Sequence, residues 1–125
     1  MFGTLVNGEV APSDMLAPGM TIVYNAPSDA VVTISLNNPT YSPAAFNLAI
    51  SATASGVASG AAPAADYISK NAVLGPCQNP ANSRYSTEKI PLASGQAISI
   101  QSDTAINYRV SGVDGADLTT AKYSF

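Results

Sequence analysis

The chain has 125 residues, of which 46% are hydrophobic and only 10% are charged, with one cysteine and no histidine or tryptophan. A chain of this length can bury roughly two-thirds of its unfolded surface, so we expect one domain that folds without disulfides or metal. The absence of histidine excludes the Ser-His-Asp triad, the Cys-His dyad and the usual zinc sets. The net charge of −3 has the wrong sign for binding nucleic acid or anionic lipid, so the expected partners are protein or carbohydrate surfaces.

The first stretch, residues 1–19, shows no clear alternation of apolar and polar residues, and we expect it to be an N-terminal arm. It carries Phe2, Leu5 and Val6, whose side chains are costly to leave in water. We expect these three to bind a partner, buried against the protein's own sheet edges or against a neighbouring subunit. The stretch lacks the basic start and apolar run of a signal peptide, and no apolar run in the chain reaches the roughly 20 residues of a transmembrane helix.

Residues 20–114 contain segments in which apolar and polar residues alternate two by two, as they do in strands with one buried face. In chain order, the expected strands are residues 21–24, 31–36, 46–51, 67–68, 90–92, 98–101 and 106–111. The alternation predicts which side chains point inward: Val32, Ile34, Leu36, Phe46, Leu48, Ile50, Ile98, Ile100, Tyr108 and Val110.

Turn-forming residues separate these segments, at positions 26–29, 37–39, 93–96 and 102–104. Gly and Asn adopt positive φ at low cost and Pro presets the first corner of a turn, so short strands with frequent turns predict an all-β fold. We expect a single antiparallel β-sandwich, immunoglobulin-like or jelly-roll-like, over residues 20–114. Residues 51–65 and 75–86 are expected to be long connections, and the first of them lacks the large apolar face of a helix.

The last stretch, residues 115–125, is expected to form a C-terminal arm or an extra strand. Tyr123 and Phe125 are its large apolar residues, and we expect both to bind a partner in the same way as the N-terminal three. Burying a large apolar side chain contributes about 1.5–3 kcal/mol, which can offset the cost of about 1–2 kcal/mol for ordering one residue of such an arm.

No set of residues in the sequence points to catalysis or to metal binding. The eight Asp and Glu residues are scattered singly, without the spacing of a calcium loop, and the glycines form no phosphate-binding motif. A glycosidase can take its two carboxylates from distant strands, but no pair stands out here. Asp66 and Asp103 lie in turn-like settings and are expected to accept backbone hydrogen bonds. We therefore expect no enzymatic activity, no catalytic residue, no metal site and no cofactor.

Three single residues have both a structural and a functional interpretation. Cys77 lies in a Pro- and Asn-rich stretch, where a free thiol in a loop is favoured over an intermolecular disulfide. Tyr108 lies on the apolar side of its alternating segment and is expected in the core. Arg109 lies on the opposite side, where a solvated or locally paired charge is favoured over a ligand contact.

Several short motifs follow one another in a specific order between Met20 and Val113. They are a Pro-containing turn, a strand closed by Asn, a strand ending in Ile-Ser, a Pro-x-x-Asp-Tyr-Ile corner, a Leu-x-x-Gly-Gln turn, a Ser-Asp-Thr-Ala turn and a strand with Arg-Val-x-Gly. In this chain they fall on Asn25 to Pro27, Asn37, Ile50-Ser51, Pro63 to Ile68, Leu92 to Gln96, Ser102 to Ala105 and Arg109 to Gly112. Over about three-quarters of the chain, this order resembles a β-sandwich domain of virion structural proteins of tailed bacteriophages. Residues 51–62 are richer in small residues than is usual in that family, and the connection over residues 75–89 is longer.

The resemblance implies a role in virion assembly and brings no catalytic site. The expected function is that of a capsid decoration or cement protein that binds the outer surface of major capsid subunits and stabilises the head. Its partners would be the major capsid protein and neighbouring copies of itself, as a homo-oligomer in the virion, with no nucleic acid or membrane partner and with synthesis in the host cytoplasm. The alternatives are a tail, collar or fibre-associated virion protein and a carbohydrate-binding, adhesin-like module, and the absence of Trp counts against the last.

Overall fold

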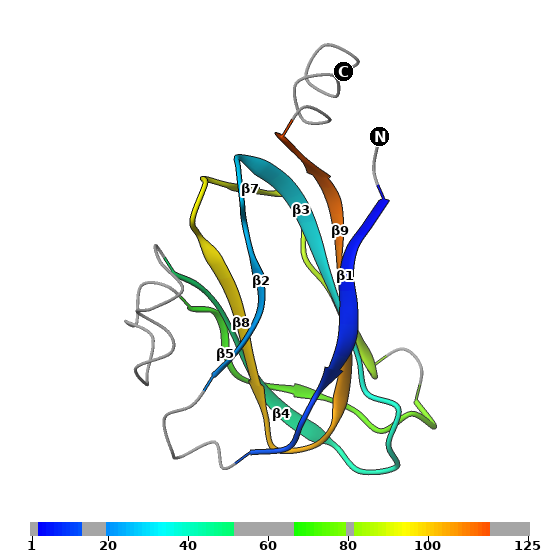
Figure 1. Cartoon of the computed structure of the whole chain (residues 1–125). Coiled ribbons are helices and arrows are strands. Elements are labelled where there is room, and N and C mark those ends of the chain that lie inside the picture. The colour runs from blue at the N-terminus through cyan, green and yellow to red at the C-terminus, as the bar shows by residue number, and fades with distance from the viewer. Residues whose placement is uncertain (1–2, 14–19, 52–66, 80–81, 116–125) are drawn as a thin grey trace.

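The computed structural model describes residues 3–13, 20–51, 67–79 and 82–115, which form nine β-strands. They make two antiparallel sheets that pack against each other, so the expected β-sandwich is confirmed (Figure 1). The first sheet has the order β1 (Gly3–Val10), β9 (Ile106–Asp114), β3 (Ala30–Asn37), β6 (Arg84–Ser86), with β7 (Ile90–Leu92) also paired to β3. The second sheet has the order β2 (Thr21–Asn25), β8 (Ala97–Ser102), β4 (Ala44–Ser51), β5 (Tyr67–Leu74). No helix within these ranges has the length and apolarity needed to span a membrane.

Apolar residues at alternate positions of the strands form the core between the two sheets. In β3, Val32, Ile34 and Leu36 are at most 2% exposed, while the residues between them are half-buried on the other face. Eight of the ten side chains expected to point inward are buried in this way. The other two, Ile50 and Tyr108, are half-buried and pack against the core. Ile50 lies past the last residue pair of β4 with β5, so within the described strands only β8 flanks it.

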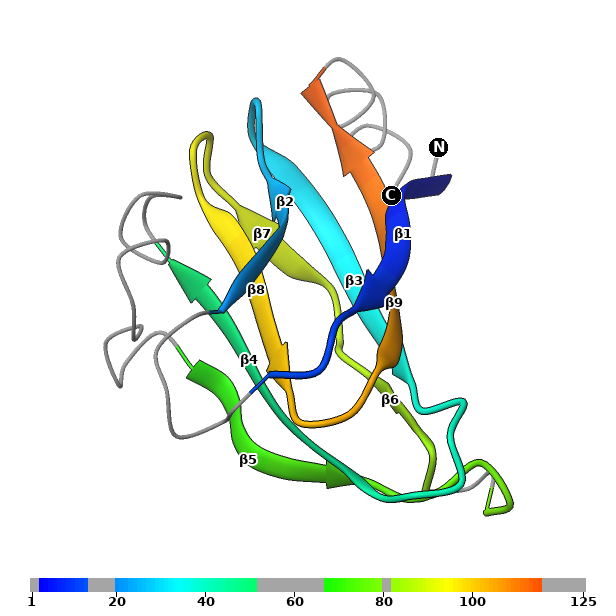
Figure 2. The same ribbon diagram turned by 60° about the horizontal axis from the view of Figure 1, so that its bottom comes forward.

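Residues 3–10, which we expected in an N-terminal arm, form the edge strand β1 of the first sheet. Figure 2 shows β1 lying next to β9, with which it pairs along its length. Leu5 and Val6 are half-buried and pack against the core, so the protein's own sheet is the site they occupy. The sandwich therefore begins before the expected residue 20, and Phe2 lies outside the described residues.

The inward row of β1 explains why its sequence shows no clear alternation. Val6, Gly8 and Val10 face inward in register with apolar or aromatic residues of β9, and Gly8 breaks the apolar series. The aromatic side chain opposite fills the space, because a Cβ on Gly8 would lie only 2.9 Å from the hydroxyl of Tyr108. A residue about one hundred positions away in sequence thus completes the inward face of this strand.

Two other strands differ from the expected ones in extent. β6 lies inside residues 75–86, where we expected a connection, and its three residues are too few to show alternation. β5 continues to Leu74, beyond the expected two residues, and passes through Asn71, whose φ of 53° is left-handed. The backbone N–H of Asn71 donates to Oδ1 of Asn47 at 2.8 Å, which stabilises the irregular pairing of β5 with β4.

The expected role of Asp103 in a turn is confirmed. Its Oδ1 accepts hydrogen bonds from the N–H of Ala45 at 2.9 Å and from the hydroxyl of Thr104 at 3.0 Å. The N–H of Asp103 donates to the carbonyl of Ala45 at 3.1 Å. The turn between β8 and β9 is therefore tied to the start of β4. Asp66, which we also expected in a turn, lies outside the described residues. So does the expected connection over residues 51–65, except for Ser51.

Candidate functional site

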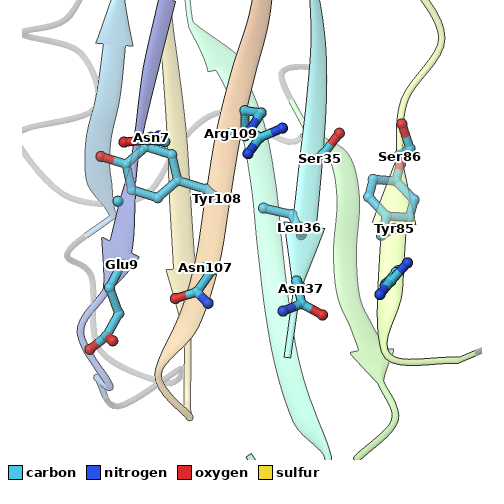
Figure 3. A pocket seen from close by; sticks show the side chains of 12 residues that line it. Asn7, Glu9, Ser35, Leu36, Asn37, Tyr85, Ser86, Asn107, Tyr108 and Arg109 are labelled. Carbon is cyan, nitrogen blue, oxygen red and sulfur yellow. The ribbon is translucent and has the colours of Figure 1, made fainter. Parts of the chain in front are cut away.

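An open hollow of about 970 Å³ lies over one end of the first sheet (Figure 3). Each of four strands contributes three consecutive residues to its lining: residues 7–9 of β1, 35–37 of β3, 84–86 of β6 and 107–109 of β9. Four segments that are far apart in the sequence are thus brought side by side by strand pairing. Because the hollow gathers eight polar or charged side chains over one sheet, we treat it as the candidate site.

Strand register arranges the outward side chains of the hollow in two rows. Cα pairing aligns Asn7, Arg109, Ser35 and Ser86 in one row, and Glu9, Asn107, Asn37 and Arg84 in the next. Figure 3 labels seven of these residues, all but Arg84, and shows the two rows one above the other across the sheet. We call these eight residues the polar face. It contains amide, hydroxyl, guanidinium and carboxylate groups and no apolar side chain.

The alternation of each strand explains why the polar face is polar. Leu36, Tyr85 and Tyr108 also line the hollow, but they alternate with the polar face and belong to the core side of the sheet. The ring of Tyr85 lies 5.5 Å from that of Phe46, at an interplanar angle of 54°, and its hydroxyl accepts a hydrogen bond from Ser69. Both tyrosines are thus engaged in the interior. The polar face offers no aromatic ring on which a sugar could stack.

The net charge of the polar face is opposite in sign to the net charge of the whole chain. Arg84 and Arg109 are exposed, and so is Glu9, which leaves the face with one net positive charge on a chain of net charge −3. No side-chain hydrogen bond or ion pair joins either guanidinium to another described residue. Adjacent strands lie about 4.8 Å apart and alternate residues about 6.7 Å apart, so the Cα atoms of the two arginines are separated by roughly 12 Å. Both cations are therefore available to a ligand.

The expected partner-binding residues do not belong to this site. Leu5 and Val6 lie on β1 but pack inward, and neither lines the hollow. Phe2, Tyr123 and Phe125 lie outside the described residues, so their expected role stays a prediction. The hollow and the terminal segments are therefore separate candidates for contact with a partner.

Cys77 lies between β5 and β6 and is a half-buried free thiol. Its backbone N–H donates to the carbonyl of Thr40 at 2.8 Å, which holds the connection against the loop that follows β3. The chain has no second cysteine with which Cys77 could form an internal disulfide, and the preference for a free thiol over an intermolecular disulfide stays a prediction.

Sequence reasoning found part of the polar face. It placed Arg109 on the polar side of an alternating strand and identified Asn37 as the residue that closes another. It missed Arg84, because β6 is only three residues long, and Asn7, because Gly8 hides the alternation of β1. The only signal for either would have been the pairing partner, which the sequence alone does not specify.

The polar face can bind through hydrogen bonds and charge. It has one carboxylate, so it lacks the carboxylate pair of a glycosidase, and its two serines have no basic side chain as a hydrogen-bond partner among the described residues. No cluster of three or more His, Cys, Asp or Glu residues that could hold a metal occurs in the described ranges. No protein-family model, curated protein or solved structure matches this chain.

Proposed function

We propose that the protein is a non-enzymatic structural component of a tailed-bacteriophage virion, a decoration or cement protein on the outer surface of the major capsid subunits. The observation that carries this proposal is the polar face, an exposed surface across four paired strands. Its amide and hydroxyl groups cost less to desolvate than the Lys and Glu side chains of ordinary solvated surfaces. Such a surface suits contact with another protein.

The places of the resemblance motifs in the sandwich also support the proposal. The Leu-x-x-Gly-Gln motif makes the tight turn from β7 to β8, where Oε1 of Gln96 accepts a hydrogen bond from the N–H of Ala93 at 2.8 Å. The Ser-Asp-Thr-Ala motif makes the turn from β8 to β9, which Asp103 ties to β4. Two of the seven motifs therefore form turns between consecutive strands of the sandwich.

The mechanism would be adhesive. Each copy contributes a modest interface, and many copies on a lattice of shell subunits act together, so the shell resists internal pressure without any single tight site. Among the described strands of its sheet, β1 pairs only with β9, so its other edge is free. A strand of a neighbouring protein could add to this edge and make a second contact.

The number of copies per particle tests the proposal. Virions of the phage that encodes the chain are purified, and quantitative mass spectrometry compares its amount with that of the major capsid protein. We expect many copies, comparable with the number of shell subunits. A few copies per particle would instead favour the tail, collar or fibre alternative, and absence from purified particles would contradict the proposal.

Adding the protein back gives a second readout. Particles produced without the chain are mixed with purified protein, and the temperature at which they release DNA is measured. We expect the protein to raise that temperature. Cys77→Ser serves as a matched variant, because the thiol is free and half-buried, and we expect it to act like the unsubstituted protein. A loss of binding in this variant would point to an intermolecular disulfide.

A further inference from the structure

We infer that the polar face binds an extended acidic segment of a partner protein, with carboxylates of the segment on Arg84 and Arg109. This inference rests on the proposed function, in which the segment belongs to the shell protein. It adds the chemistry of the contact, which neither the sequence motifs nor the fold specify. The two arginines, the spacing between them and the groups that lie between them carry the argument.

The charges of the polar face favour a carboxylate ligand. Both guanidiniums are exposed and have no ion pair with a described residue, so a ligand need not displace an existing partner. A guanidinium presents a planar set of donors that matches a carboxylate in two parallel hydrogen bonds. Glu9, the one anion of the face, lies three strands away from Arg84 but only one strand and one row away from Arg109, so it disfavours a carboxylate at Arg109 more than at Arg84.

The spacing of the arginines favours an extended segment. Their Cα atoms lie roughly 12 Å apart, and residues four positions apart in an extended chain are separated by about 13 Å on the same side. A segment with acidic residues at positions i and i+4 can therefore place one carboxylate on each guanidinium.

The groups between the arginines suit a polypeptide backbone. Ser35 and Asn37 lie on β3, the strand between β9 and β6, and both are half-buried. Their hydroxyl and amide groups can donate and accept hydrogen bonds with peptide N–H and C=O groups of a chain that crosses them. With Tyr85 and Tyr108 turned to the core side, the face lacks the ring platform that sugar or unpaired base recognition generally uses.

The probe for the test is a short synthetic peptide of Ser and Gly with Glu at two positions about four residues apart. It is titrated into the full-length isotope-labelled protein, and backbone amide shifts are followed by NMR. We expect shifts concentrated in residues 7–9, 35–37, 84–86 and 107–109 and a binding constant that weakens with added salt. A peptide with Gln in place of both Glu residues is the control. Equal binding of the two peptides, or shifts centred elsewhere, would overturn the inference.

Arginine variants test the contact directly. Arg84→Gln and Arg109→Gln are each expected to weaken peptide binding about fivefold, and the double variant roughly 25-fold if the two act independently. Lys89→Gln removes an exposed cation outside the hollow and is expected to bind as the unsubstituted protein does. All three substituted side chains are exposed, and the unbound NMR spectra of the four variants verify the fold. Unchanged binding in both arginine variants would overturn the inference.

Particle binding separates this inference from the proposed function. If Arg84→Gln and Arg109→Gln populate particles as fully as the unsubstituted protein, the acidic-segment contact is wrong while the capsid role stands. If the unsubstituted protein binds the acidic peptide but is absent from particles, the capsid role fails and the chemistry of the polar face stands. Tighter binding of single-stranded DNA or of a neutral polysaccharide to the same residues would overturn the inference in favour of that ligand.

Discussion

The central strands of the two sheets differ in how far their residues are exposed to water. In β3 of the first sheet, buried and half-buried residues alternate along all eight positions. In β8 of the second sheet, all six residues are buried, including Ser99, Gln101 and Ser102. The first sheet therefore keeps a face open for a partner, whereas β8 is removed from water on both sides.

The difference shows that a polar residue in an alternating strand is not necessarily exposed. Ser99 and Ser51 are at most 3% exposed, and neither hydroxyl has a hydrogen-bond partner among the residues that the structure describes. An unpaired buried hydroxyl costs free energy, so the second sheet carries a penalty that the polar face of the first sheet avoids. Buried Asn47 is different, since its amide donates to Oε1 of Gln101 at 3.2 Å.

The largest expected effect lies in the core that the two sheets share. Leu48 on β4 is fully buried, and truncating it leaves a cavity that both sheets line. We expect Leu48→Ala to lower the free energy of unfolding by about 2–5 kcal/mol. Chemical denaturation of the purified protein measures this loss. A cost below about 1 kcal/mol would show that the two inner faces do not pack around this side chain.

A second test concerns the backbone of the first sheet. Gly112 of β9 pairs with Val32 of β3, and a Cβ at this position would collide with the carbonyl oxygen of Val31. We expect Gly112→Ala to destabilise the fold by about 3 kcal/mol, measured in the same way.

Gly8→Ala is the matched control for that substitution, because its Cβ would meet only side-chain atoms of Tyr108, the hydroxyl at 2.9 Å and ring carbons at 3.1 and 3.2 Å, and no backbone atom. We expect a cost under about 1 kcal/mol there. Equal costs for Gly8→Ala and Gly112→Ala would contradict the assignment of the close backbone approach to β9 and β3.

A third test addresses a hydrogen bond that joins the two sheets. The hydroxyl of Tyr24 on β2 donates to Asp114 on β9 at 3.1 Å, and burial, this hydrogen bond and the negative charge of the carboxylate raise the pKa of Tyr24 to about 12. An unfolded tyrosine titrates near pH 10. Between about pH 10 and 12 the unfolded chain releases this proton while the folded chain retains it, so stability falls as pH rises through that window.

Urea unfolding at several pH values measures this dependence. The contribution is fully present below about pH 10, and Tyr24→Phe is expected to reduce the decline above it. An identical decline in the two proteins would show that Tyr24 does not retain its proton in the folded state.

The smallest expected changes in the free energy of unfolding are those from substituting one outward serine in each sheet. Ser99→Ala removes a buried hydroxyl without a partner, and we expect the free energy of unfolding to rise by about 1 kcal/mol. Ser35→Ala, at a half-buried position of the polar face, is expected to change it by less than about 0.5 kcal/mol. Thermal melts of both variants check this. A destabilised Ser99→Ala would mean that its hydroxyl has a partner after all.

The sequence by itself determined the fold class and most of the core. Period-two alternation identified the strands around Val32, Leu48, Ile100 and Val110, because one buried face requires apolar residues at every second position. The sequence of the turn likewise predicted that Asp103 accepts hydrogen bonds there. Its bond from the hydroxyl of Thr104 is local, whereas its bond from the N–H of Ala45 depends on the pairing of β8 with β4.

Only the tertiary structure decided which segments lie beside one another. Gly8 faces inward because Tyr108 of β9 fills its place, and Arg84 joins the polar face because β6 pairs with β3. The burial of Ser99 is equally invisible in an alternating strand. Strand register, and whether a sheet face is buried, depend on contacts between segments that are far apart in the sequence. No local pattern therefore encodes them.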